Sequence, residues 1–94
     1  MSYPKDEMAP PPAVHDDERA FELARVWLAQ GAPHVALRTG MWPDPAAWGI
    51  VLVDLARHVA LAYHQSGALA LDEAFERVLV GMRAELEGPA ERED

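Results

Sequence analysis

Three polar residues interrupt the apolar stretch WGIVLVDLARHVALAYHQ, residues 48–65, and are the first candidates for chemistry: Asp54, Arg57 and His58. If the stretch is helical, Asp54 and His58 stand four residues apart and lie side by side on the helix surface. A carboxylate in that position can orient an imidazole that acts as a general base. The same two side chains can also serve as ligands of a metal ion, with the carboxylate setting the imidazole tautomer.

Neither chemistry is complete within this stretch. Zinc sites use at least three protein ligands, and His64, six residues after His58, lies on another side of the helix. His34 or a second copy of the chain would have to complete the site. The chain has no cysteine, which excludes a thiol nucleophile, and it shows neither a nucleophile motif nor a glycine-rich phosphate loop. We therefore predict no catalytic residue, no metal ligand and no cofactor, and the sequence leans against an enzyme without settling the question.

A structural role explains the same three residues more simply. Buried or half-buried charges must be paired, and Asp54 can pair with Arg57 or His58 along the helix or with a group on a second subunit. A polar cluster on an interface helix can fix the register of a dimer. We favour this interpretation, and the alternative, a small-ligand or metal site at Asp54, Arg57 and His58, stays open.

Three tryptophans, Trp27, Trp42 and Trp48, are the other candidates for a site. Together with Arg25 or Arg38 they could form a cation–π pocket for a small ligand. Tryptophans more often anchor a core or a dimer, because each buries a large apolar area. Trp42 and Trp48 are expected to pack together at the start of the helix.

The elements that must position these residues are two helices. Asp44 is a good N-cap and Pro45 suits the first helical position, so a helix is predicted over residues 45–65, ended by Gly67. A second helix is predicted over 72–87, joined by a short connection and therefore antiparallel to the first. The apolar face predicted for the first helix consists of Trp48, Leu52, Leu55, Val59 and Ala62, and that of the second consists of Leu71, Phe75, Val78, Leu79, Met82 and Leu86.

Residues 19–40 fit either a helix or strands by local pattern. Residues 34–38 (HVALR) are too short for a helix and indicate a strand. A lone strand leaves backbone groups unpaired, and a hairpin through residues 30–33 would supply its partner. The predicted fold is α+β: a β-hairpin followed by two antiparallel helices in two layers. The alternative is an all-α protein of three helices.

A two-stranded ribbon exposes two edges and is marginal alone. Pairing with a second copy is the simplest remedy, and twofold dimers are the commonest assemblies. We therefore expect a homodimer.

The composition bounds partners and location. The chain has 94 residues and a net charge of −8. One basic residue against five acids in the proline-rich segment 1–18, and one against three in 89–94, place most of this charge in two segments that we predict to be disordered. A single small domain is expected over 19–88. An acidic chain without a basic stripe predicts no nucleic-acid binding. No apolar run approaches membrane-spanning length and no signal peptide is visible, so a cytoplasmic protein that binds no membrane is expected.

Four segments carry a family resemblance: RVW (25–27), HVALR (34–38), W-x-D-P-x-A-W-G (42–49) and D-L-A-R-H-V-A-x-A-Y (54–63). They resemble the bacterial family called domain of unknown function 5076, over about residues 20–88. The resemblance implies a small, acidic protein with a hairpin and helices, and no activity, ligand or catalytic residue. The function expected from all these observations is a homodimeric protein-interaction or accessory module, with a possible further protein partner.

Overall fold

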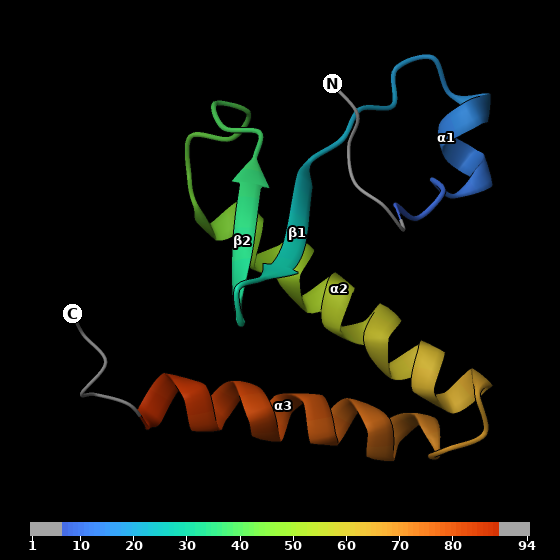
Figure 1. Cartoon of the computed structure of the whole chain (residues 1–94), viewed down its shortest axis with the longest axis vertical. Coiled ribbons are helices and arrows are strands. Elements are labelled where there is room, and N and C mark those ends of the chain that lie inside the picture. Colours follow the sequence, from blue (N-terminus) through green and yellow to red (C-terminus); the bar gives the residue numbers. More distant parts are fainter. Residues whose placement is uncertain (1–6, 89–94) are drawn as a thin grey trace. The chain divides into compact units, whose positions relative to one another are not determined.

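The computed structural model describes residues 7–88. Its elements are α1 (Pro12–Asp16), β1 (Ala24–Ala29), β2 (Ala32–Leu37), α2 (Ala46–Gln65) and α3 (Leu71–Glu87) (Figure 1). The fold is α+β, a hairpin followed by two helices as predicted, and the three-helix alternative is wrong because residues 24–29 form a strand. The chain divides into two compact units, Met1–Met41 and Trp42–Asp94, where one domain over 19–88 was expected. Each unit is described by itself below.

The ends of the chain were both predicted to be disordered. Residues 1–6 and 89–94 lie outside the described residues. Within the predicted arm, the structure contains the short helix α1, which the sequence does not predict. Pro12 occupies its first position, which suits proline because the ring fixes φ near the helical value. The Val14 N–H donates to the Pro11 carbonyl at 3.0 Å. All five residues of α1 are exposed.

The hairpin in the first unit is tighter than predicted. Strands β1 and β2 are antiparallel, and Ala29 pairs with Ala32 across a two-residue turn. The turn residues Gln30 and Gly31 have φ values of 55° and 79°, which is the geometry of a type I′ turn that follows the twist of the strands. Pro33, expected in the turn, lies in β2 opposite Leu28.

The second unit contains both long helices, and its predicted end signals are confirmed. The Ala46 N–H donates to Asp44 Oδ1 at 2.9 Å, so the Asp44 carboxylate satisfies a free amide of the first turn of α2. At the other end Gly67 has a φ of 87°. The Gly67 and Ala68 N–H groups donate to the carbonyls of His64 and Tyr63 at 2.9 and 3.2 Å, which is the pattern of a Schellman motif.

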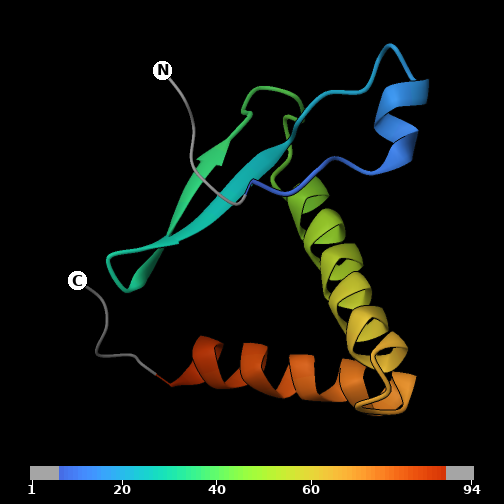
Figure 2. The same cartoon turned by 45° about the vertical axis from the view of Figure 1, so that its right-hand side comes forward.

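Helices α2 and α3 pack against each other near their connection and diverge away from it (Figures 1 and 2). Among the described residues, the buried apolar ones are Ala56 and Ala60 of α2 and Ala74 of α3. Small side chains let the two backbones approach closely, so the contact is made by alanines with Phe75 half-buried beside them. The predicted stripe of α3 is half-buried in its middle and exposed at both ends, where Leu71 and Leu86 are 46% and 84% exposed.

The apolar face predicted for α2 is not the face that packs on α3. Leu52, Leu55 and Val59 are 52%, 54% and 38% exposed, whereas Ala56 and Ala60 take the buried positions. The prediction of a core on that face is therefore wrong for this contact. The reason is geometric: the width of the apolar stripe does not show which part of it meets the neighbouring helix, and small residues allow the closest approach.

Among the described residues, α2 is the one helix that is long and apolar enough to cross a membrane by length and composition alone. It has 20 residues, with a mean hydropathy of 1.3 in its most apolar window. The expectation that no apolar run approaches this length is therefore wrong. Length and composition do not distinguish a membrane span from a helix covered by protein, and only 11% of that window is buried here.

Candidate functional site

Asp54 and His58 lie one helical turn apart on the surface of α2. His58 Nδ1 is 2.8 Å from the Asp54 backbone oxygen and 3.4 Å from Asp54 Oδ2. A carbonyl oxygen only accepts hydrogen bonds, so this geometry assigns the proton to Nδ1 and leaves Nε2 as the acceptor of the neutral ring. Both side chains are about two-thirds exposed, at 67% and 68%.

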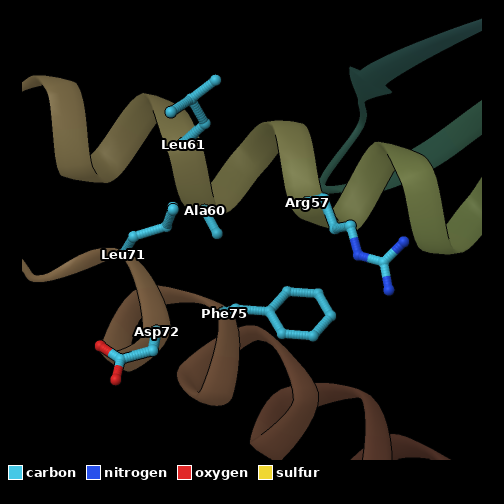
Figure 3. Close-up of a pocket in the computed structure, with 6 residues that line it drawn as sticks. All are labelled: Arg57, Ala60, Leu61, Leu71, Asp72 and Phe75. Carbon is cyan, nitrogen blue, oxygen red and sulfur yellow. The ribbon is translucent and has the colours of Figure 1, made fainter.

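Arg57 points away from this pair and toward α3. Its guanidinium carbon lies 5.7 Å from the centroid of the Phe75 ring, a cation–π distance. Figure 3 shows the Arg57 side chain reaching toward the ring from α2. The predicted trio is therefore divided into an exposed Asp54–His58 pair and an arginine that belongs to the contact between the helices.

An open groove of about 620 Å³ follows the contact between α2 and α3. Its lining is almost entirely apolar and comes from Ala60, Leu61, Leu71 and Phe75, with Arg57 and Asp72 as the charged residues (Figure 3). Leu71 and Phe75 were predicted as ordinary core residues. The groove depends on how the two helices meet, and the periodicity of each helix alone carries no signal for it.

Two of the three tryptophans lie against each other. Trp42 and Trp48 pack together as predicted, with ring centroids 5.5 Å apart and planes at 77°. This edge-to-face arrangement is favourable for aromatic rings and fixes the chain before α2. Trp27 lies in β1, half-buried and opposite His34.

The open end of the hairpin holds Arg25 and Arg38, the two arginines that were considered as partners of the tryptophans. Arg38 Nε donates to the Glu22 carbonyl at 2.8 Å, and its guanidinium lies 5.4 Å from the centre of the Phe21 ring, not over a tryptophan. Arg25 pairs with Glu22 and, at 2.8 Å, with Glu7. The hydrogen bond that Arg25 donates to the Glu22 carboxylate raises the pKa of Arg25, so this arginine stays charged. These contacts hold the segment before β1 against the hairpin.

The described residues also bear on metal binding. Over 7–88, no three His, Asp or Glu side chains come together as a set that could hold a metal ion. Asp54 and His58 therefore have no third ligand from this part of the chain. What the pair can do by itself is accept or donate a proton at an exposed imidazole.

Comparison with known proteins defines the class of this protein. The model of the family "Domain of unknown function (DUF5076)" matches residues 7–90. The chain belongs to this family, and the resemblance seen in its sequence segments is confirmed. No curated protein matches the chain.

A solved structure from the photosynthetic bacterium Rhodopseudomonas palustrus is similar to this chain. It is 36% identical, with a TM-score of 0.71, and the match covers 96% of this chain and 90% of that one. That protein is described as a "putative pyruvate dehydrogenase". The two chains share a fold over nearly their whole lengths.

Proposed function

We propose that this protein acts through contacts with other protein chains, as a homodimeric interaction or accessory module. The observation that carries the proposal is the exposure of its apolar side chains. Among the described residues the buried apolar side chains are three alanines, while Val26, Leu28 and Ile50 are 63%, 80% and 73% exposed. Soluble monomers rarely expose large contiguous apolar patches, and such patches mark interaction sites.

The hairpin carries the clearest of these patches. Cross-strand neighbours share a face of a sheet, so the register places Ala24, Val26, Leu28, Pro33, Val35 and Leu37 on one side. All six are apolar and all six are exposed. A face of this composition is stabilised when a partner removes it from water.

The test of this proposal is the mass of the full chain in solution. Size-exclusion chromatography with light scattering at micromolar concentration should give twice the mass of one chain, and dilution should reveal dissociation. A constant mass of one chain over the whole concentration range would contradict the proposal.

A second candidate function is binding of a small ligand, and the groove between α2 and α3 favours it. The groove offers apolar walls, an aromatic ring and the cation of Arg57, which suits an apolar molecule with a negative group. A thermal-shift screen with metal ions and carboxylic acids tests it. A shift lost in Arg57→Ala would locate the ligand in the groove, and a shift lost in both Asp54→Ala and His58→Ala would locate it at the exposed pair.

The description of the Rhodopseudomonas palustrus relative suggests an assay and a partner. An assay of pyruvate oxidation by the purified chain tests the activity that the description names. We expect none from a chain that acts through contacts with other proteins. The interaction role that we propose predicts instead that this chain acts on an enzyme as an accessory protein, and adding it to a pyruvate dehydrogenase assay tests that.

We also propose that the protein is cytoplasmic and binds neither membranes nor nucleic acid. Asp54 and Arg57 lie near the middle of α2, where each would cost about 2.5–3.5 kcal/mol on insertion into a bilayer. The net charge of −8 opposes binding to phosphate backbones. Cell fractionation and a vesicle flotation assay check the two parts of this proposal.

A further inference from the structure

The two edges of the hairpin present different backbone groups. In an antiparallel pair, residues alternate between those bonded to the partner strand and those whose N–H and C=O point outward. The Arg38 N–H donates to the Leu23 carbonyl at 2.9 Å, and the pairing continues through Arg25–Ala36 and Trp27–His34. The residues between these bonded positions therefore point their backbone groups outward: Ala24, Val26 and Leu28 in β1, and Pro33, Val35 and Leu37 in β2.

Proline interrupts only one of these edges. Pro33 has no N–H, so the outward edge of β2 lacks a donor at its first position, and proline on an edge strand is a known way to prevent pairing. The edge of β1 keeps a donor and an acceptor at all three outward positions. No further strand from the described residues pairs with it, because the sheet has two strands in the order β1–β2.

We propose that the edge of β1 pairs antiparallel with the β1 edge of a second copy, with Val26 on the twofold axis. This inference rests on the proposed homodimer and adds its interface. In that register the Val26 residues of the two copies are opposite each other, and Ala24 is opposite Leu28. Every outward residue of β1 then exchanges both backbone bonds with its counterpart. The result is a four-stranded sheet in the order β2–β1–β1–β2.

The side chains favour this occupant and this register. On one face, pairing places the two Val26 side chains next to each other and each Ala24 next to Leu28 of the other copy, so exposed apolar side chains meet across the new junction. On the other face, Arg25 of one copy comes opposite Trp27 of the other, which allows a cation–π contact. A twofold axis at Arg25 would instead place two arginines opposite each other, and like charges in that position are destabilising. An axis at Trp27 would leave Ala24 without a strand residue opposite it.

Single cysteines test the interface directly, because the chain has none of its own. The pair of Val26 residues would have Cα atoms about 5.5 Å apart, within the range of a disulfide. Val35 is the matched control: it is the same residue type on the same face, 55% exposed against 63% for Val26. Three strand spacings would separate the two copies of Val35, about 14 Å, so no disulfide can form.

We expect mild oxidation of the Val26→Cys protein to give mostly a disulfide-linked dimer, and the Val35→Cys protein to remain unlinked. If the wild-type protein is a dimer and Val26→Cys folds but does not link, or links no more than Val35→Cys, the β1 interface is wrong and the homodimer stands. If the wild-type protein is a monomer, both proposals fail.

Hydrogen exchange of the unmodified full chain provides a test that does not depend on a variant folding. The Val26 and Leu28 amides should exchange slowly and lose their protection on dilution, whereas those of Val35 and Leu37 should exchange fast at every concentration. Rapid exchange at Val26 in the dimer would overturn the proposal. Slow exchange at Val26 that does not change with concentration would also overturn it, because another part of the same chain would then cover the edge.

Discussion

The hairpin and the helix pair leave different kinds of groups unsatisfied. Inside α2 and α3 the backbone N–H groups are bonded within each helix, so what these helices expose is side chains, such as Leu55 and Leu86. The hairpin exposes side chains as well, but it also exposes the donors and acceptors of its edges. The helix pair therefore needs a partner of suitable shape, whereas the hairpin needs a partner strand in a particular register.

This difference shows where specificity in an assembly can come from. Apolar contact is not directional, so an exposed stripe on α2 can be covered in several ways. Strand pairing is directional, and slipping by one residue turns every side chain to the other face. We therefore expect changes in the hairpin to alter association, and changes between α2 and α3 to alter folding.

The largest effect should come from Ala60→Asp in the helix pair. Ala60 is 1% exposed, and an uncompensated buried charge costs about 3–5 kcal/mol. Urea denaturation monitored by circular dichroism measures the decrease in the free energy of unfolding. Ala84→Asp is the control, because Ala84 is an exposed alanine of α3. Equal midpoints for the two variants would show that the contact between α2 and α3 is not what stabilises this unit.

The next effect tests the hairpin edge. Val26→Pro removes an outward N–H without removing a bond between β1 and β2, and a dimer loses one such bond from each copy. At about 0.5–1.5 kcal/mol for each bond, the Kd should rise roughly 5- to 150-fold, which analytical ultracentrifugation can measure. Val35→Pro places proline at the matched position of β2 and should leave the Kd nearly unchanged. An equal rise of the Kd in both variants would show that the edges of β1 and β2 do not differ in this way.

The same difference explains which parts of the fold could be predicted from sequence. The ends of α2 depend on local chemistry, and Asp44 and Gly67 identify them. The hairpin followed from the need of one strand for another. The face of α2 that meets α3 could not be predicted, because Trp48, Leu52 and Val59 mark a wide apolar stripe that does not show where the neighbouring helix packs.

The candidate site was predicted less well than the fold. Spacing correctly placed Asp54 beside His58, since neighbours four residues apart on a helix need no tertiary information. It did not show that Arg57 turns toward Phe75, because that contact depends on the packing of α2 against α3. The groove escaped prediction for the same reason.

A smaller effect should appear at the connection between the helices. Gly67 has a φ of 87°, and an alanine in the left-handed region costs about 1–2 kcal/mol. Gly67→Ala should lower the free energy of unfolding by about that amount. Gly81→Ala should raise it by about 0.5–1 kcal/mol, because Gly81 lies inside α3 with open space around its Cβ position. If the denaturant midpoints of both variants shifted in the same direction from that of the wild-type protein, this account of the turn would be contradicted.

The smallest effect should come from the Asp54–His58 pair. Its size tests whether the pair takes part in the folding of the helix pair or in assembly. Asp54→Asn keeps the shape of the side chain and the bond from His58 to the backbone oxygen, and it removes only the charge. An exposed pair of this spacing contributes about 0.2–0.5 kcal/mol, and added salt should reduce that further. Glu76→Gln is the matched control, since Glu76 is a similarly exposed acid 3.3 Å from Arg83. If Asp54→Asn costs several times more than Glu76→Gln, or changes the Kd of the dimer, then assembly buries the pair. Asp54 and His58 would then face the second subunit, although they are exposed in the single chain.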